Sequence, residues 1–536
     1  MQKLIAFLVF FFLFINLKAQ NDAAPSNSLQ RPKLVVGIVV DQMRWDFLYR
    51  YYDKYLPDGG FKRLLGQGFS CENTLIPYVP TITACGHTSI YTGSVPAING
   101  ITGNDWFDYN KNSLVYCTGD NTVKTVGSNT DEGEMSPRNL TVTTISDELK
   151  LTTNFQSKVI GIALKDRGAI LPAGHTADAA YWYDSQTGDW ITSTYYEKAL
   201  PAWMKKLNAR KLVDDYYSRD WNPLYPLNTY TESNIARTNL PYSLKQFVDK
   251  NYKIISNTPY GNSLTFDVAK AAINGEQLGA DSITDMLMVS LSSPDYIGHA
   301  FGPNSAEIED CYLRLDKEVG TFLNFLDSAI GKDQYLIFFT ADHGAAQEPY
   351  FLKTHKVPAG NFDNDDVSAE LNDSLKAKFK VENLLYNIIN YQVYLNRDAI
   401  EKNKLNKDSV YATVINFLMQ NPAIERAFPL KDVSKTTLSK EIKEAVSNGY
   451  YPGRSGDIQL IFKPQWIDGF LKGGTTHGVW NLYDAHIPLI WYGWNIMQGN
   501  SNREMYMTDI AATVSALLHI QMPGGSIGHV IQEVVK

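Results

Sequence analysis

The sequence predicts an α/β fold, a three-layer sandwich around a mostly parallel central sheet, on the basis of two patterns. First, several short segments are apolar and rich in β-branched residues, as strands buried on both faces of a parallel sheet are. These segments are residues 33–40, 158–164, 285–292, 335–341 and 486–493. Second, helical patterns lie between them, as in residues 305–330, where apolar side chains recur at helical spacing. Strands that alternate with helices are typical of a sheet covered by helices on both faces.

Two long segments interrupt this alternation. Residues 176–274 are rich in Tyr and Trp and have few continuous strand patterns, so we interpret them as a cap over the core. Residues 349–470 form a second insertion, with a helix-rich piece and a strand pattern at DIQLIFKP. A chain of 536 residues exceeds what one hydrophobic core usually supports. We therefore expect one large domain with insertions or two domains, and we favour one domain over residues 20–536 that carries both insertions.

The first 19 residues read as a secretory signal peptide. Lys3 precedes an apolar run over residues 4–17, and Leu17-Lys18-Ala19 resembles a cleavage site. No later window is long and apolar enough to span a membrane, so we expect no integral membrane segment in the mature chain. The expected location is periplasmic or secreted.

Charge and cysteine content limit the partners and the type of metal site. The formal net charge of -8 argues against a nucleic-acid-binding surface, which is normally basic. Four cysteines, Cys71, Cys85, Cys117 and Cys311, have no CxxC spacing, so a cysteine zinc site is not indicated. In an oxidising compartment they could form disulfides, and buried thiols are the alternative. We expect a monomer that acts on small molecules.

Charged residues follow four of the expected strands. They are Asp41, then Lys165 with Arg167, then Asp295, and finally Asp342 with His343. In open α/β sheets the ligand crevice lies just beyond the carboxyl ends of the strands. We therefore expect these side chains to converge on one site, although they are far apart in the sequence.

Carboxylates and imidazoles in this set indicate metal binding. Asp295 and His299 are four residues apart and share one face of a helix, although a surface pair is the commoner reason for that spacing. Asp342 and His343 end an apolar strand, where two ionisable groups are costly without a partner.

A third histidine, His477, lies in the glycine-flanked segment GGTTHGVW. His486 is its competitor, but it begins the last expected strand, so we expect it at the opposite end from the crevice. Three carboxylates and three imidazoles suit zinc. Two zinc ions roughly 4 Å apart stabilise the attacking and leaving oxygens of phosphoryl transfer.

The stretch VPTITACGHTSIYTG, residues 79–93, contains five candidate nucleophiles, namely Thr81, Thr83, Cys85, Thr88 and Ser89. A run of small hydroxylated residues before a helix usually caps the helix and does no chemistry. Capping is therefore the alternative to a catalytic role. His87 lies in the same stretch, and the residues alone do not decide which candidate acts.

Taken together, Asp41, VPTITACGH, GITGNDW, LKDRG, DYIGH, ADHG and TTHG resemble the alkaline phosphatase superfamily. Within it, the chain is most similar to the flavobacterial phosphate-irrepressible type, whose nucleophile is a threonine. Type I phosphodiesterases and nucleotide pyrophosphatases are related to it. The resemblance spans essentially the whole mature chain. It implies hydrolysis of phosphate monoesters through a phosphothreonine intermediate at a site with two Zn²⁺ per chain.

The resemblance also implies roles for individual residues. Thr83, four residues before His87, takes the place of the nucleophile. One zinc is held by Asp41, Asp342 and His343 and also binds Thr83, and the other, which faces the leaving group, is held by Asp295, His299 and His477. The sequence departs from the family at Cys85, where proline is expected. A sulfatase, whose catalytic cysteine lies in a C-x-P-S-R-like motif, is disfavoured because CGHTS lacks that proline and arginine.

Three further residues bear on the choice of substrate. Asn104 lies where the family places an amide donor to a phosphoryl oxygen, and Lys165 and Arg167 match the pair that marks the monoesterases. Two Zn²⁺ balance three aspartates and an ionised Thr83, so these two cations suit a monoester dianion. Arg167 is able to bind it with two hydrogen bonds. A phosphodiesterase or nucleotide pyrophosphatase with the same metal core is the alternative, and a non-enzymatic binding protein is a second one.

Overall fold

The computed structural model describes residues 29–231, 238–469 and 473–535, so the expected signal peptide lies outside the described residues. An 11-stranded sheet runs through residues 34–506 in the order β17-β2-β18-β10-β1-β9-β6-β7-β8-β5, with β19 paired to β2. None of the helices in the described ranges has the length and apolar composition of a membrane span.

The strands of this sheet include all five expected segments, the last of them divided into two strands, but five further strands were not predicted. The strands of the sheet are β1 (Leu34–Val40), β2 (Phe69–Leu75), β5 (Thr125–Val126), β6 (Val159–Ala163), β7 (Ala179–Tyr183), β8 (Trp190–Ser193), β9 (Asp285–Leu291), β10 (Tyr335–Thr340), β17 (His486–Ile487), β18 (Leu489–Gly493) and β19 (Gly499–Tyr506). The central strands β10, β1, β9, β6 and β7 are parallel to one another. Antiparallel β18 and β8 flank them. The predicted α/β fold with a mostly parallel sheet is confirmed.

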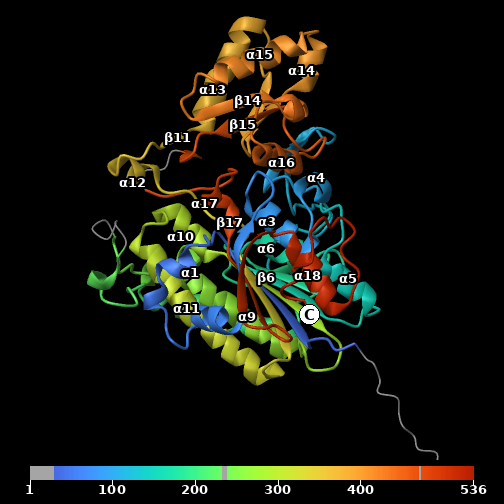
Figure 1. Ribbon diagram of the computed structural model, residues 1–536, viewed down its shortest axis with the longest axis vertical. Helices are drawn as coiled ribbons and strands as arrows, with labels where there is room; N and C mark the ends of the chain where they lie inside the picture. The colour runs from blue at the N-terminus through green and yellow to red at the C-terminus, as the bar shows by residue number, and fades with distance from the viewer. Residues whose placement is uncertain (1–28, 232–237, 470–472, 536) are drawn as a thin grey trace, which may run out of the picture. The chain divides into compact units, whose positions relative to one another are not determined.

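Helices cover both faces of the sheet, which gives the expected three layers (Figure 1). One group of helices packs together as α2 (Gly60–Gln67), α9 (Tyr260–Glu276), α10 (Ser293–Phe301) and α11 (Ala306–Leu326). The other group is α3 (Thr83–Thr92), α5 (Ile145–Thr152), α6 (Asp166–Ala173) and α18 (Asp509–Leu518). The helix expected within residues 305–330 is α11, which begins after the N-cap Ser305.

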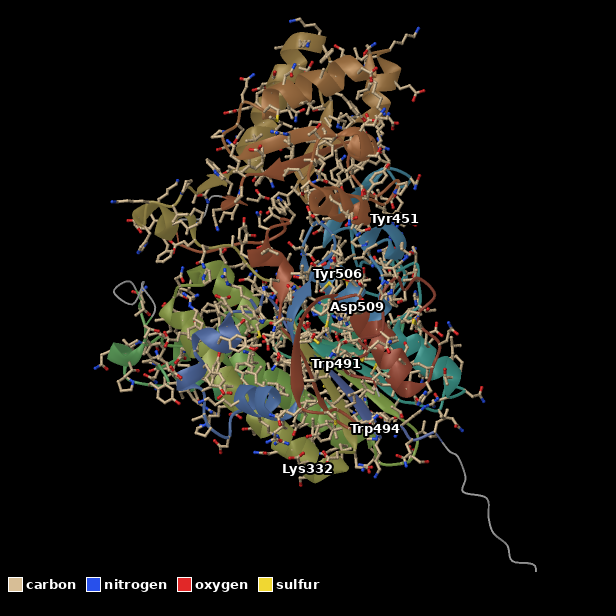
Figure 2. The ribbon with its side chains drawn as sticks, in the orientation of Figure 1. Lys332, Tyr451, Trp491, Trp494, Tyr506 and Asp509 are labelled. Carbon is tan, nitrogen blue, oxygen red and sulfur yellow. The ribbon has the colours of Figure 1, made fainter. Side chains whose placement is uncertain are left out.

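Strand β1 lies at the centre of the sheet and is buried along its whole length. A Cβ atom at Gly37 would lie 2.2 Å from the Tyr91 hydroxyl of α3 and 2.5 Å from the Phe338 ring of β10. Only glycine therefore allows α3 to pack this closely on β1. Trp491 of β18 is also fully buried in this core (Figure 2).

The segment 176–274 is only partly a cap. Strands β7 and β8 belong to the central sheet, and α9 packs against β9 and β6. The cap interpretation is therefore wrong for these three elements, because the sequence AAYWY of β7 mixes small and aromatic residues and hides its strand pattern. The helices α7 (Ala202–Asn208) and α8 (Leu212–Tyr217) lie between β8 and α9.

The segment 349–470 builds a second sheet with a hydrophobic core of its own. Its strand order is β12 (Leu385–Ile389), β13 (Gln392–Leu395), β15 (Ile458–Phe462) and β14 (Ile424–Pro429). Its helices are α12 (Pro349–Thr354), α13 (Asn364–Phe379), α14 (Arg397–Lys402), α15 (Lys407–Leu418) and α16 (Lys440–Gly449). The expected strand at DIQLIFKP is β15. Side chains from α13, α14, α15 and the four strands form a separate apolar cluster, whereas Val446 of α16 packs with Val79 in another.

The remaining short elements lie near the ends of the sheet strands. They are α1 (Phe47–Arg50), α4 (Pro96–Asn99), α17 (Leu482–Ala485), the hairpin β3 (Asp105–Asp108) and β4 (Ser113–Tyr116), and the parallel pair β11 (Gly360–Phe362) and β16 (Trp466–Asp468). The β3–β4 hairpin directly follows Asn104.

All four cysteines are buried free thiols, so the structure supports the buried-thiol alternative over disulfides. Burial raises the pKa of the Cys71 and Cys85 thiols well above the ordinary value. A thiol that stays protonated and buried is a poor nucleophile and is slow to oxidise. The thiols of this chain are therefore expected to persist even in an oxidising compartment.

We expect the purified native chain to react slowly with a thiol reagent, and the denatured chain to expose four thiols without prior reduction. Reductant should leave the melting temperature unchanged, because no disulfide contributes to stability. Fewer than four reactive thiols in freshly denatured protein would contradict the structure.

Candidate active site

The polar residues that follow the central strands meet at the carboxyl edge of the sheet, as expected from the topology. Asp41 directly follows β1, and one residue separates Asp342 from the end of β10. The helix α10, which follows β9, carries both Asp295 and His299. Ligand atoms of Asp295, His299 and His477 lie within 4.8 Å of one another, and so do those of Asp41, Asp295 and His343. The two groups share Asp295.

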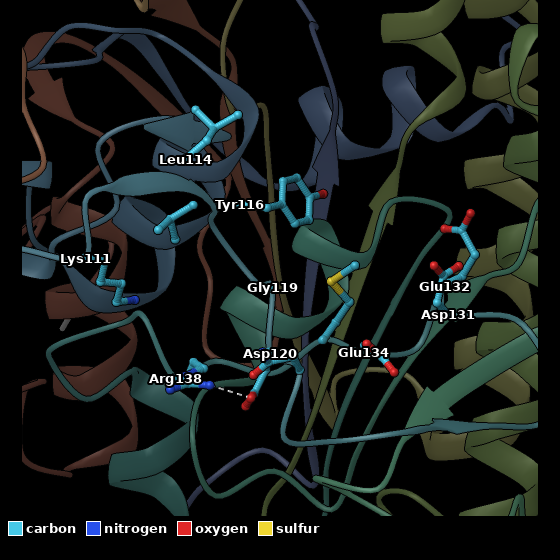
Figure 3. A pocket seen from close by; sticks show the side chains of 12 residues that line it. Lys111, Leu114, Tyr116, Gly119, Asp120, Asp131, Glu132, Glu134 and Arg138 are labelled. Carbon is cyan, nitrogen blue, oxygen red and sulfur yellow. Dashed lines mark hydrogen bonds and ion pairs between the residues drawn. The ribbon is translucent and has the colours of Figure 1, made fainter. Parts of the chain in front are cut away.

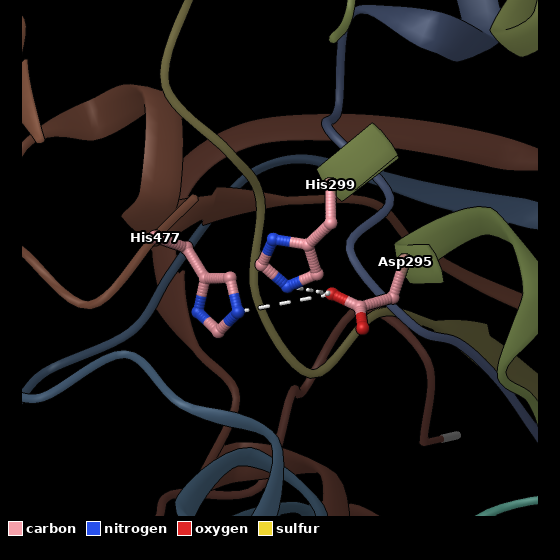
Figure 4. A group of neighbouring side chains, drawn as sticks. All are labelled: Asp295, His299 and His477. Atoms are coloured by element: carbon pink, nitrogen blue, oxygen red, sulfur yellow. Dashed lines mark ion pairs between the residues drawn. The ribbon is translucent and has the colours of Figure 1, made fainter. Parts of the chain in front are cut away.

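In the first group, two imidazoles face one carboxylate (Figure 4). The Oδ1 atom of Asp295 is 3.1 Å from Nε2 of His299 and 3.7 Å from Nε2 of His477. The Nδ1 atoms of these rings are 2.8 Å from the Thr475 carbonyl and 2.7 Å from the Thr81 carbonyl. A ring nitrogen bonded to a carbonyl fixes the tautomer and leaves the other nitrogen as a metal ligand.

The second group lies directly beside the first and is fully buried. Nε2 of His343 is 3.6 Å from Oδ1 of Asp41 and 3.4 Å from Oδ2 of Asp342, so Asp342 also lies at this group. His343 Nδ1 is 2.9 Å from the Gly344 carbonyl. Oδ1 of Asp41 is buried and has no hydrogen-bond partner among the residues that the structure describes. Nitrogen and carboxylate donors of this kind fit zinc.

Lys165 compensates for the crowding of carboxylates at the site. Its ammonium is 2.6 Å from Oδ2 of Asp41 and 2.6 Å from Oδ2 of Asp295. Burial, together with the charges of Asp295 and Asp342, raises the pKa of Asp41. Burial opposes ionisation of Asp295 as well, but His299 and Lys165 hold its pKa well below the ordinary value. Although burial disfavours the ammonium, Asp295 and Asp41 raise the pKa of Lys165.

Gln42 is a site residue that the sequence analysis missed. Its side-chain Nε2 donates to Oδ1 of Asp295 at 2.6 Å, and its backbone N–H donates to Oδ1 of Asp342 at 3.1 Å. Its φ of 66° lies in the left-handed region, which non-glycine residues rarely adopt. Adjacency to Asp41 was the only sequence signal, because no local pattern predicts that backbone conformation for glutamine.

Among the five candidate nucleophiles, Thr83 has its side-chain oxygen beside the ligand nitrogen of His343. It is the first residue of α3, and its Oγ1 is 3.4 Å from Nε2 of His343. The N-cap of α3 is Ile82, whose side chain makes no capping hydrogen bond, and the hydroxyls of Thr81 and Thr88 bond elsewhere, so the interpretation of this stretch as its own helix cap is wrong. Thr81 instead donates to the Val479 carbonyl, and Thr88 donates to the Ala84 carbonyl inside the helix.

Cys85 and His87 lie behind Thr83, inside the protein. Cys85 Sγ contacts the Ile101 carbonyl at 3.2 Å. His87 Nδ1 is 2.9 Å from the Thr83 carbonyl and 3.3 Å from Oδ2 of Asp342. His87 therefore contacts both Thr83, a nucleophile candidate, and Asp342, a candidate metal ligand.

Asn104 and Arg167 lie close to the start of α3 and of α6, respectively. Asn104 Oδ1 accepts a hydrogen bond from the Ala84 backbone N–H at 3.1 Å, which leaves its amide hydrogens for another partner. Arg167 follows Lys165 in the first turn of α6, and its Nη1 donates to the Tyr116 hydroxyl at 3.1 Å.

His486 is not part of the site, but the reason given from the sequence is wrong. Strand β18 is antiparallel to β10, so its first residue, Leu489, pairs with Thr340 at the carboxyl end of β10. His486 therefore begins at the crevice side of the sheet. Its Nε2 bonds to the Glu72 carbonyl at 2.9 Å and its ring stacks on Trp45, which holds it away from the ligand groups.

A cavity of about 540 Å³ lies beside the first group of ligands. His299, His477, Ile82 and Asn104 line it on the side of the central sheet. Residues of the segment 349–470 line the rest, among them Asn390 and Tyr391. The site therefore has a cavity into which a small substrate fits.

Comparison with known proteins identifies the family of this chain. Residues 35–480 match the model of the type I phosphodiesterase / nucleotide pyrophosphatase family. Alkaline phosphatase PhoV of Synechococcus elongatus is 51% identical over 534 residues, which cover 97% of this chain and 96% of PhoV. Alkaline phosphatase PafA of Elizabethkingia meningoseptica is 50% identical and covers 96% of both chains. A calcium-transporting ATPase of Myroides odoratus is 52% identical and covers 95% of this chain and 96% of its own.

The fold agrees with these relatives. A crystal structure of wild-type alkaline phosphatase PafA matches this structure with a TM-score of 0.92 and 48% identity, covering 95% of this chain and 100% of PafA. A second crystal structure is of a PafA variant in which a threonine, an asparagine, a lysine and an arginine are replaced. The chain thus belongs to the type I phosphodiesterase / nucleotide pyrophosphatase family.

Proposed function

We propose that this chain is an alkaline phosphatase that hydrolyses phosphate monoesters at a two-zinc site. The observation that carries the proposal is the position of Thr83, whose Oγ1 lies 3.4 Å from His343 beside the two overlapping ligand groups. The names of PhoV and PafA, each about half identical over nearly the whole chain, support it. So do the four residue types replaced in the PafA variant, because Thr83, Asn104, Lys165 and Arg167 follow in the same order.

The candidate ligands divide between two Zn²⁺ ions. Asp41, Asp342 and His343 would hold one ion together with Thr83, and Asp295, His299 and His477 would hold the other. When bound, zinc supplies positive charge that favours an ionised nucleophile and a departing alkoxide. Thr83 then attacks phosphorus, the ester oxygen leaves, and water releases phosphate from the resulting phosphothreonine.

The residues around Thr83 orient the phosphoryl group. The amide hydrogens of Asn104 donate to one phosphoryl oxygen, because its Oδ1 is already held by Ala84. The Arg167 guanidinium carries five donors in a rigid fork, and Tyr116 is its one hydrogen-bond partner among the described residues. Lys165 adds a second positive charge close to Asp41 and Asp295.

The two cations favour a monoester over a diester. A monoester carries one more negative charge than a diester, and Lys165 and Arg167 supply two positive charges beyond those that balance the aspartates and Thr83. A phosphodiesterase or nucleotide pyrophosphatase with the same metal core is the second candidate, because the family model that matches this chain is named for those activities.

We also propose a periplasmic or secreted location, from the N-terminal pattern of residues 1–19, and a monomer. Residues 20–536 would form one catalytic domain. Its first insertion would be shorter than the sequence suggests, because β7, β8 and α9 belong to the central layers.

Exhaustive chelation should abolish turnover, zinc should restore it, and metal analysis of the active protein should find two ions per chain. His477→Ala should lower the zinc content, because it removes one ligand. His486→Ala is the matched control and should keep both ions, since His486 bonds to Glu72 and not to the site. Full activity after chelation, or no more than one ion per active chain, would contradict the two-zinc proposal.

Thr83→Ala should reduce monoester turnover by several orders of magnitude, because the variant has no oxygen to attack phosphorus. Acid quenching during turnover, followed by peptide mapping, should find phosphate on Thr83. Cys85→Ala should keep most of the activity, because Cys85 is buried against Ile101 and away from the ligands. Phosphate found on Thr81, Thr88 or Ser89 would refute this assignment.

The wild-type protein should hydrolyse a monoester faster than a diester, and replacing Lys165 and Arg167 together by Ala should lower monoester kcat/KM by orders of magnitude. Hydrogen bonds to charged groups contribute roughly 1.5 to 3 kcal/mol each, and a dianion uses them more fully. Diester kcat/KM should change much less, so the ratio of the two constants is the quantity to measure. ATP belongs in the panel, because one relative is named an ATPase.

Arg138→Ala is the control for that experiment, because it removes a charge that pairs with Asp120 outside the site. Its ratio should equal that of the wild type. A wild-type preference for the diester would reverse the assignment in favour of the second candidate. An equal loss on both substrates in the double variant would show that the two cations support the site without selecting the substrate.

A further inference from the structure

The Arg167 guanidinium is held by a short series of hydrogen bonds to residues that make or break no bond in the proposed reaction. Nη1 of Arg167 donates to the Tyr116 hydroxyl at 3.1 Å. That hydroxyl donates its own hydrogen to Oδ1 of Asp166 at 2.8 Å. Oδ2 of Asp166 accepts a hydrogen bond from the Thr118 hydroxyl. Because Asp166 takes the phenol hydrogen, an oxygen lone pair of Tyr116 is left to face Arg167.

Tyr116 is also tied to Asn104 through the β3–β4 hairpin. Tyr116 ends β4 and pairs with Asp105, the first residue of β3. The next residue, Cys117, donates its backbone N–H to the Asn104 carbonyl at 2.8 Å. Asn104 in turn accepts from Ala84, the neighbour of Thr83. The hairpin therefore connects three residues of the proposed reaction, namely Thr83, Asn104 and Arg167.

We propose that Tyr116 is a positioning residue that fixes the Arg167 guanidinium for the phosphoryl group and so helps to select monoesters. The inference rests on the proposed function, since Arg167 must contact the phosphoryl group. Burial raises the pKa of Tyr116, and the negative charge of Asp166 raises it further. The phenol therefore stays neutral and keeps the hydrogen that it donates to Asp166.

Holding one edge of the guanidinium prepares the other edge for the substrate. Nε of Arg167 is buried and has no hydrogen-bond partner within the described ranges. A planar fork with one Nη fixed and the Nε side free suits two parallel hydrogen bonds to phosphoryl oxygens. Without the Tyr116 hydroxyl the Arg167 guanidinium gains rotational freedom. Asp166 also loses a hydrogen-bond donor, so its carboxylate attracts the guanidinium toward α6. Either change misaligns the fork.

The hydroxyl of Tyr116 can be removed with little disturbance to packing. Replacing Tyr116 by Phe removes one oxygen atom and keeps the ring, and the residue lines a cavity of about 580 Å³ (Figure 3). Tyr116→Phe therefore tests the hydrogen bond and not the ring. In the same cavity Arg138 pairs with Asp120 and not with the Arg167 site.

The test is a double-mutant cycle on the zinc-loaded full-length protein, with Tyr116→Phe, Arg167→Ala and the combined variant. Tyr116→Phe should lower monoester kcat/KM roughly tenfold, as expected for the loss of one hydrogen bond to a charged group. Diester kcat/KM should fall less than threefold. The inhibition constant for inorganic phosphate, which reports binding without turnover, should rise in parallel. In the Arg167→Ala background, Tyr116→Phe should change monoester kcat/KM less than twofold.

Tyr109→Phe is the matched control on the same hairpin. The Tyr109 hydroxyl donates to Oδ2 of Asp457 at 2.7 Å, so this variant removes a similar phenol–carboxylate hydrogen bond without touching Arg167. Its melting temperature should fall about as much as that of Tyr116→Phe. Its monoester-to-diester ratio should stay within twofold of the wild type.

The possible failures are distinguishable. If Arg167→Ala leaves the monoester-to-diester ratio unchanged, the proposed role of Arg167 is wrong and the inference falls with it. If Arg167→Ala lowers the ratio but Tyr116→Phe does not, or if the two effects multiply in the combined variant, the proposed function stands and the positioning role of Tyr116 is overturned. A ratio change in Tyr109→Phe equal to that in Tyr116→Phe would also overturn it.

Discussion

The site depends on keeping carboxylates buried side by side. Asp41, Asp295 and Asp342 are all fully or almost fully buried, and the Lys165 ammonium lies 2.6 Å from each of the first two. Burying a charge without a partner costs several kcal/mol, so the surrounding structure must supply cations and donors. It does so with Lys165, with the side-chain amide and the backbone N–H of Gln42, and with the imidazole of His299, whose pKa is raised by Asp295 although burial opposes the charge. The same crowding makes the site suited to divalent cations, which neutralise several carboxylates at once.

The strand order explains how carboxylates that are far apart in the sequence lie close together in the structure. β1 pairs with β9 on one side and β10 on the other, all parallel, so Asp41, Asp295 and Asp342 emerge at neighbouring points of one sheet edge. The next strand, β6, pairs with β9 and brings Lys165 to the same edge. The position of the lysine, and with it its contacts with two carboxylates, is thus a consequence of the sheet order and not of a local motif.

The sequence predicted those parts of the site that local patterns determine. Apolar runs gave the central strands and their polar ends, and the four-residue spacing of Asp295 and His299 placed both on α10. It did not predict Gln42 or Tyr116, because their roles arise from contacts between separate elements. It also did not predict β7 as a strand, because its aromatic residues led us to assign it to a cap, and it did not predict that β18 runs antiparallel to β10. Strand direction at a sheet edge depends on tertiary pairing, which a single sequence does not encode locally.

The start of α3 shows why Cys85, where the resemblance leads us to expect proline, is compatible with the proposed site. With Ile82 as the N-cap, Cys85 is the third residue of the helix, and Gly86 makes the first helical hydrogen bond to the Ile82 carbonyl. The N–H groups of the first helical residues have no intrahelical partner, so proline and cysteine are both tolerated there. The N–H group that matters is that of Ala84, because it orients Asn104. One helical turn thereby presents the Thr83 hydroxyl and holds the Asn104 side chain, and the roles proposed for both are compatible with cysteine because neither contact uses the side chain or the N–H group of residue 85.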